Sequence, residues 1–361
     1  MDKKDEIIGM QLELIRSMTE NNIRRLGEDI WGRVPPKNGN GEPKKDSPAS
    51  TGGDKGGAAV STGDTGVSPG KDAVPEEEPE KLEDLMAELD GYIGLGNVKR
   101  EVRALINMAK VYKMRRDNDL PVSDTSLHMV FSGNPGTGKT MIARFMARVY
   151  RSIGLLSKGQ LVETDRGGLV AGYIGQTAIK TGAVLEKALG GVLFIDEAYG
   201  LTNKSENDFG GEAVDTVLKY MEDHRDDIVV IVAGYTELME DFIESNPGLR
   251  SRFNKYVKFD DYTGPEMADI FRFQCKKGCY EADEDAMREL EAYFDAAAEF
   301  SADFGNARGV RNTFEKVLSE QANRLAEAEE VTKDDLMKIT VEDVRAALYP
   351  DAENIPEKEE E

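Results

Sequence analysis

The chain has 361 residues, a length that allows about two domains and a substantial hydrophobic core. Its net charge of −23 opposes a large electrostatic footprint on DNA or RNA, because neutralising phosphates requires clustered Lys and Arg. No apolar run approaches the length of a membrane span, and the N-terminus lacks the apolar segment of a secretion signal. We therefore expect a cytoplasmic protein that binds neither nucleic acid nor a membrane.

Residues 1–34 are predicted to form an N-terminal amphipathic docking helix. Its apolar residues recur at mostly helical spacing: Ile8, Leu12, Ile15, Ile23, Leu26 and Ile30. A helix that packs back on the main body, or one that frays, fits the same pattern. Residues 35–80 are rich in Gly, Pro, Ser, Asp and Lys and almost free of large apolar side chains, which predicts a disordered linker.

A phosphate-binding loop of the form G-x-x-x-x-G-K-[ST] follows the strand-like run Leu127 to Phe131. Its glycines allow backbone N–H groups to turn toward phosphates, Lys139 can reach the β- and γ-phosphates, and the Thr140 hydroxyl can bind Mg²⁺. Met141 to Tyr150 then reads as an amphipathic helix whose N-terminus faces the phosphates. The residues expected to bind the nucleotide are Gly133, Asn134, Pro135, Gly136, Thr137, Gly138, Lys139, Thr140 and Met141.

An acidic pair, Asp196 and Glu197, ends the apolar run Val192 to Ile195. Such a run predicts a strand buried on both faces, and parallel α/β sheets place their ligands at the carboxyl ends of strands. We expect Asp196 to hold Mg²⁺ together with Thr140, and Glu197 to activate water for hydrolysis of ATP. A solvated turn would explain an acidic pair that stood alone, but not one that follows a phosphate loop.

Strands and helices alternate through this half of the chain. Strands are predicted at Gln160 to Thr164 and Ile228 to Ala233, and helices at Thr177 to Leu189 and Glu212 to Met221. This order predicts a P-loop NTPase fold of the α/β class, a parallel sheet with helices on both faces.

After Tyr262 only helices are predicted, and they indicate a small C-terminal helical domain. Their ranges are Pro265 to Lys277, Glu284 to Glu299, Ala307 to Ala326 and Val341 to Leu348. Cys275 and Cys279 stand one helical turn apart, but with only His128 and His224 elsewhere they offer no four-ligand metal site. The same scarcity argues against histidine-based catalysis, and we expect a packing role for His128 inside its strand.

Several phrases resemble the AAA+ ATPases, and specifically the CbxX/CfxQ group, which includes red-type Rubisco activases and stage V sporulation protein K. They are Gly190 to Tyr199, Glu212-Ala213-Val214, Tyr220 to Asp223, Ala233-Gly234-Tyr235 and Asn246 to Phe253. The resemblance covers about Leu82 to Leu348. It implies an ATPase domain at 81–262, an all-helical AAA+ lid at 263–349 and an acidic tail at 350–361.

The resemblance also implies a ring, usually a homo-hexamer, with ATP at the subunit interfaces and an arginine finger from the neighbour. Arg252 is the first candidate for the finger and Arg250 the second, because a guanidinium suits the spread charge of the phosphoryl transition state. Gly305-Asn306-Ala307-Arg308 resembles the sensor-2 motif, which implies that Arg308 contacts ATP and reports its state to the lid, although Arg311 lies only one turn away. Gly234-Tyr235 replaces the polar residue that many members carry as sensor 1, so that residue stays unassigned.

Tyr173, Ile174 and Gly175 resemble the pore loop that grips a polypeptide in the ring. A tyrosine among glycines can wedge against an extended chain, whereas a tyrosine buried in a turn is the competing interpretation. The function expected is an ATP-driven motor that remodels or threads a protein partner of unknown identity. An ATP-dependent assembly switch or scaffold is the alternative, while a nucleic-acid loader and a small-molecule kinase fit the sequence less well.

Overall fold

The computed structural model describes residues 78–121, 126–173, 175–202, 208–299 and 301–350. The predicted docking helix, the linker as far as residue 77, Ile174 and the acidic tail from residue 351 onward lie outside this part of the chain. Within it, none of the helices has the length and apolar character needed to cross a membrane.

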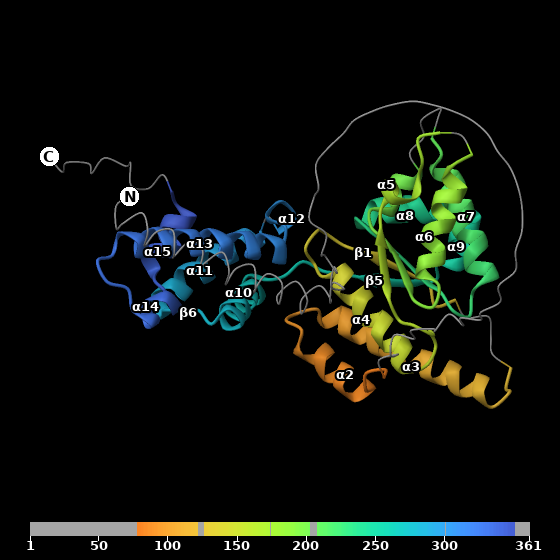
Figure 1. The fold of residues 1–361 in the computed structure, drawn as a ribbon, viewed down its shortest axis with the longest axis horizontal. Helices are drawn as coiled ribbons and strands as arrows, with labels where there is room; N and C mark the ends of the chain where they lie inside the picture. Colours follow the sequence, from red (N-terminus) through yellow and green to blue (C-terminus); the bar gives the residue numbers. More distant parts are fainter. Residues whose placement is uncertain (1–77, 122–125, 174, 203–207, 300, 351–361) are drawn as a thin grey trace, which may run out of the picture. The chain divides into compact units, whose positions relative to one another are not determined.

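Five parallel strands form one sheet in the order β2-β3-β4-β1-β5 (Figure 1), which confirms the predicted parallel sheet. The strands are β1 (Met129–Ser132), β2 (Leu161–Thr164), β3 (Val192–Ile195), β4 (Val229–Gly234) and β5 (Lys255–Lys258). Strand β1 begins two residues later than expected, so His128 precedes the strand rather than lying inside it. Strand β5 was not predicted; its sequence Lys-Tyr-Val-Lys has no apolar run, because β5 is an edge strand with one buried side chain, Val257.

Helices cover both faces of the sheet (Figure 1), also as predicted. One face carries α2 (Leu82–Gly91), α3 (Gly96–Asp117) and α4 (Lys139–Ser152). The other carries α5 (Arg166–Leu169), α6 (Thr177–Ala188), the 3₁₀ helix η1 (Ala198–Thr202), α7 (Gly210–Asp223), α8 (Thr236–Glu244) and α9 (Pro247–Arg252). Successive side chains of a strand point to opposite faces, so Phe131 packs on the first side and Val130 on the second.

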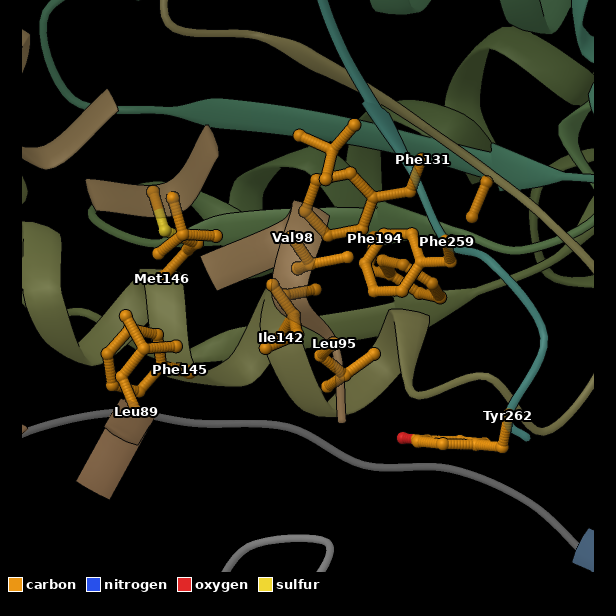
Figure 2. Close-up of a cluster of buried hydrophobic side chains, with 14 of the residues drawn as sticks. Leu89, Leu95, Val98, Phe131, Ile142, Phe145, Met146, Phe194, Phe259 and Tyr262 are labelled. Carbon is orange, nitrogen blue, oxygen red and sulfur yellow. The ribbon is translucent and has the colours of Figure 1, made fainter. Parts of the chain in front are cut away.

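The core beneath α3 and α4 fixes the end of the sheet where the phosphate loop begins. Figure 2 shows Phe131, Phe194 and Phe259 gathered beside Val98 and Ile142. The rings of Phe131 and Phe259 lie 5.1 Å apart between centroids, a separation typical of favourable aromatic pairs. Because all of these side chains are fully or almost fully buried, the loop that follows β1 starts from a rigid support.

The C-terminal part is helical, as predicted. Helices α10 (Gly264–Gly278) and α15 (Val341–Leu348) both pack on α11 (Glu284–Ala298) and α13 (Ala307–Glu327), and α12 (Ser301–Phe304) and α14 (Lys333–Met337) are shorter. Helix α10 begins with a capping box between Thr263 and Glu266. The expectation of helices alone was wrong in one detail: β6 (Glu281–Ala282) and β7 (Lys338–Ile339) form a short parallel pair. Two-residue strands carry no periodic signal.

Tyr150 of α4 has its side chain completely buried, and its hydroxyl has no hydrogen-bond partner among the described residues. A buried hydroxyl without a partner loses its hydrogen bonds to water and gains none in the protein. Tyr150→Phe removes this hydroxyl and is therefore expected to raise the free energy of unfolding by about 1 kcal/mol. Urea unfolding measures the change. Tyr92→Phe is the matched control, because the Tyr92 hydroxyl donates to Glu88 at 2.5 Å and its removal should destabilise the protein. Equal losses in both variants would contradict the expectation.

His128 is buried beside Phe253, and its Nδ1 accepts a hydrogen bond of 3.0 Å from the Val230 N–H. Burial, assisted by the nearby Arg252 charge, lowers the pKa of His128 to about 4 from its usual 6.5. Between these values the unfolded chain binds a proton that the folded chain does not, so stability falls as the pH is lowered through this window.

We expect the free energy of unfolding to fall by about 2 to 3 kcal/mol because of His128 when the pH is lowered from 7 to 4.5. The measurement is urea unfolding of wild type and His128→Gln at both pH values, in which the wild type should lose more stability. His224 is exposed, so His224→Gln provides the control and should follow the wild type. A wild type and a His128→Gln variant with the same acid dependence would show that His128 does not carry the effect.

Candidate functional site

The loop between β1 and α4 has the backbone geometry of a phosphate cradle. Gly133, Gly136 and Gly138 have φ angles of +148°, +75° and +95°, which side chains rarely tolerate. A Cβ atom at Gly133 would also overlap the carbonyl oxygen of Phe259. The Gly133 N–H donates to the carbonyl oxygen of Gly234 at 3.1 Å, and this bond fastens the start of the loop to β4. The glycines are therefore required by the fold of the loop itself, and they leave its backbone N–H groups able to face an anion.

Lys139 is the first residue of α4, and its ammonium group lies over the loop. Its Nζ donates to the carbonyl oxygens of Gly133 and Asn134, at 2.8 and 2.7 Å. Burial lowers the pKa of Lys139, and the negative charge of Asp196 opposes this shift. The lysine charge thus lies between the loop and the acidic end of β3. Thr140 and Met141 follow in the first turn of α4, both partly buried.

The acidic pair lies at the carboxyl end of β3, as predicted. Asp196 and Glu197 are exposed, and the Asp196 N–H donates to the carbonyl oxygen of Thr164 at 2.8 Å. Glu197 has a φ angle of +48°, an unfavourable conformation for a residue with a Cβ atom. Both carboxylates open onto a cavity of about 610 Å³ lined also by Glu163, Thr164, Asp165, Gly168 and Phe194. The pair is therefore accessible from solvent and fixed by its backbone.

Two tyrosines lie near the acidic pair, and their positions could not be judged from the sequence. Tyr235 directly follows β4, the strand that separates β1 from β3 in the sheet. Its ring centroid is 6.2 Å from that of Tyr199, whose ring packs against Gly234. Burial raises the pKa of Tyr199, with a smaller contribution from the negative charge of Glu197. The sequence signals were the place of Tyr235 at the end of a buried strand and the resemblance that puts Gly234-Tyr235 where many AAA+ members carry sensor 1.

Helix α9 carries both candidate finger arginines, and the structure places them differently. Arg252 is half-buried and forms an ion pair with Glu222 of α7, while its carbonyl oxygen accepts from Ser126 at 2.5 Å. Arg250 is exposed, and its side chain forms no hydrogen bond or ion pair with the part of the chain that the structure describes. Spacing alone could not separate the two.

The first turn of α13 brings Arg308, and not Arg311, into the electrostatic surroundings of Lys139. Arg311 pairs with Glu315 on the outside of the same helix, at 3.0 Å. The Ala307 N–H donates to the carbonyl oxygen of Gly136 at 3.2 Å, so this turn touches the phosphate loop directly. Lys139 of α4 and Arg308 of α13 thus both contribute positive charge to the surroundings of the phosphate loop.

The loop that contains Tyr173 is anchored at its base and open at its tip. Lys180 of α6 donates to the carbonyl oxygens of Gly167 and Val170, at 2.6 and 2.9 Å. The side chain of Tyr173 is 74% exposed, so it is not the buried turn tyrosine of the competing interpretation. A Cβ atom at Gly175 would meet no other group within 4 Å. Tyr173 therefore stands on a fixed base with free space around it.

The two cysteines are not among the residues of this site. Cys275 is buried, which raises its pKa to about 12, whereas Cys279 is exposed at the end of α10. Among the described residues no group of three or more His, Cys, Asp or Glu side chains is arranged to hold a metal ion.

Comparison with known proteins agrees with this architecture. Residues 129–261 match the family model "ATPase family associated with various cellular activities (AAA)", and residues 263–354 match the model "AAA lid domain". Stage V sporulation protein K of Bacillus subtilis is 38% identical over 265 residues, which cover 73% of this chain and 82% of that protein.

Of two further relatives, one is named as an activase of a carboxylase. The chloroplastic ribulose bisphosphate carboxylase/oxygenase activase of Cyanidioschyzon merolae is 42% identical over 73% of this chain and 90% of its own length. Protein CbbX of Cereibacter sphaeroides is 42% identical over 74% of this chain and 86% of its own length. With the phosphate loop, the acidic pair and a helical lid in one chain, this protein belongs to the CbxX/CfxQ group of AAA+ ATPases.

Proposed function

We propose that the protein couples ATP hydrolysis to the remodelling of a protein partner. The observation that carries the proposal is the meeting of the phosphate loop, Lys139 and the acidic pair at one end of the sheet. The loop would bind the phosphates through its backbone N–H groups and Lys139. This set of groups matches the needs of a nucleoside triphosphate.

Mg²⁺ fits the residues present. It prefers oxygen ligands and usually takes only one or two from the protein, the rest coming from water and phosphate. Thr140 and Asp196 would supply a hydroxyl and a carboxylate of this kind. When bound, Mg²⁺ would neutralise charge on the β- and γ-phosphates.

Glu197 would take the proton of the attacking water. Glu197 is exposed and lines the cavity, and its backbone has a positive φ angle. Tyr235 lies at the end of the intervening strand, and we assign it to the sensor-1 place that the sequence left unassigned. An arginine from a neighbouring subunit would complete the site in a hexameric ring, with Arg252 or Arg250 as the source.

The exposed Tyr173 supports a motor rather than a switch. A large ring that is 74% exposed on an anchored loop offers contact area to a polypeptide at little cost in conformational entropy. One of the relatives is named as an activase of ribulose bisphosphate carboxylase/oxygenase, and this suggests that enzyme as one partner to test. An unfolded polypeptide is a more general partner to test.

Tyr173→Ala is expected to weaken binding of a fluorescein-labelled unfolded polypeptide by about tenfold or more, because truncation removes the contact area of the ring. The measurement is fluorescence anisotropy in the presence of ATP and the hydrolysis-blocking change Glu197→Gln. In the otherwise native protein, basal ATP hydrolysis should be nearly unchanged, since other residues hold the phosphates. Tyr173→Phe should restore binding better than Tyr173→Ser.

Tyr256→Ala supplies the matched control, because Tyr256 is 53% exposed on β5 and lies outside the loop. It should leave polypeptide binding unchanged. Full binding and remodelling by Tyr173→Ala would favour the assembly switch, in which nucleotide binding alone does the work. The same comparison with labelled ribulose bisphosphate carboxylase/oxygenase tests the partner suggested by the relatives.

A further inference from the structure

Asp261 lies between the phosphate loop and the C-terminal helices and accepts hydrogen bonds from both. The Asn134 amide nitrogen lies 3.0 and 2.9 Å from the two oxygens of Asp261. The Asn306 amide nitrogen donates to Asp261 Oδ1 at 2.8 Å. One carboxylate therefore joins a loop residue to the residue that precedes α13.

Asn306 is held in a conformation that would suit glycine. Its φ and ψ angles are +56° and −132°, and its side chain is completely buried. Such a backbone costs energy and persists only when the surroundings impose it. Here Asn306 Oδ1 accepts from the Tyr262 N–H at 2.9 Å, and its Nδ2 also approaches the carbonyl oxygen of Pro135 at 3.3 Å. The side-chain bonds thus explain why an asparagine, and not a glycine, occupies this turn.

The main chains of the loop and the turn are in contact as well. The Ala307 N–H donates to the carbonyl oxygen of Gly136, and a Cβ atom at Gly136 would overlap the carbonyl oxygen of Gly305. Arg308 is two residues beyond Asn306, in the same turn of α13. A displacement of the loop would therefore be passed to the segment that carries Arg308.

Asn134 connects this network to Lys139. Its carbonyl oxygen accepts from Lys139 Nζ at 2.7 Å, and it also accepts from the Thr137 hydroxyl at 2.8 Å. Phosphates that attract the ammonium group would compete with the Asn134 carbonyl for it. The peptide of Asn134 would respond, and its own side chain is bonded to Asp261.

We propose that Asn134, Asp261 and Asn306 form a relay that reports occupancy of the phosphate loop to the C-terminal helices. Asp261 and Asn306 are positioning residues in this relay, since they act through the loop and through Arg308 without touching the nucleotide. The proposal rests on the nucleotide site proposed above. It adds a second connection, because the side-chain amides couple the two segments whether or not Arg308 contacts a phosphate.

The test compares hydrogen–deuterium exchange of peptides from α10 and α13, with and without a saturating non-hydrolysable ATP analogue. Asn306→Gly is the main variant, because glycine accepts the positive φ angle and so spares the fold while it removes the side-chain bonds. Asp261→Asn is the second, because it replaces one of the two carboxylate oxygens that accept from the amides with an NH2 group, which can only donate. Asp260→Asn is the control, an exposed neighbour in which the same change of charge leaves the relay intact.

We expect nucleotide to slow exchange in α10 and α13 of the wild type and of Asp260→Asn. Asn306→Gly and Asp261→Asn should bind the analogue with a Kd within about fivefold of the wild type, yet lose most of this protection. Thermal unfolding of each variant checks that the fold is kept.

A full response of α10 and α13 in saturated Asn306→Gly and Asp261→Asn would overturn the relay. So would a wild type that binds the analogue with no change in these helices. A wild type that binds no nucleotide at all would instead overturn the proposed nucleotide site, so the two failures are distinguishable.

Discussion

Replacing Glu197 with glutamine is expected to lower ATP turnover by about 10²-fold or more while ATP remains bound. The amide keeps the size of the side chain and its place at the cavity but cannot accept a proton from water. The phosphate loop and Lys139 are untouched, so the affinity for nucleotide should hold. Steady-state phosphate release and equilibrium binding of a fluorescent ATP analogue measure the two effects separately.

Two further variants make this result specific. Lys139→Ala should weaken nucleotide binding itself, because it removes the ammonium group that lies over the loop. Glu163→Gln changes another carboxylate that lines the same cavity, one that is paired with Arg144, and should leave turnover within a few-fold of wild type. Near-normal hydrolysis by Glu197→Gln, or an equal loss in Glu163→Gln, would remove Glu197 from its assigned role.

The arginine finger should be supplied by a neighbouring subunit, so its loss should be repaired in mixed rings. Arg252→Ala is expected to lower turnover by about 10³-fold, and mixing it with inactive Lys139→Ala subunits should restore activity. Each subunit then supplies what the other lacks. The measurement is ATP turnover as a function of the mixing ratio.

The ion pair between Arg252 and Glu222 makes a sharper comparison possible. If Arg252 serves only that pair, Glu222→Gln should reproduce the defect of Arg252→Ala. If Arg252 is the finger, Glu222→Gln should keep turnover near wild type, since an exposed pair contributes about 1 kcal/mol or less. Arg250→Ala, tested in the same way, identifies the finger if Arg252→Ala stays active. Mixed rings that regain no activity would argue against a shared site.

The strands and helices that carry strong periodic signals could be predicted from the sequence. The apolar runs of β3 and β4 are buried on both faces, and their predicted ranges differ little from those observed. Strand β5 has one buried residue and exists because Lys255 to Lys258 pair with β1, a tertiary event with no local signature. The pairing of β6 with β7 was not predicted for the same reason.

The residues of the candidate site also fall into those that local motifs predict and those that only tertiary contacts reveal. The phosphate loop and the acidic pair are local motifs, so their residues could be named from spacing. The difference between Arg250 and Arg252 depends on Glu222 in a separate helix, and that contact has no trace in the local sequence. Asp261 was missed, and Asn306 was noted only as part of the motif around Arg308, because the bonds that join Asn134, Asp261 and Asn306 form only when the chain folds.

The order of the strands also fixes the distance between the phosphate loop and Asp196. Strand β4 stands between β1, which leads to the phosphate loop, and β3, which ends in Asp196. Two neighbouring spacings of a sheet amount to about 10 Å, and hydrogen bonds along the strands hold that width constant. The span open to a row of phosphates and a metal ion is therefore set by strand pairing. Helices α4, α5 and α6 and strand β2, which connect β1 to β3, can change in length or sequence without altering it.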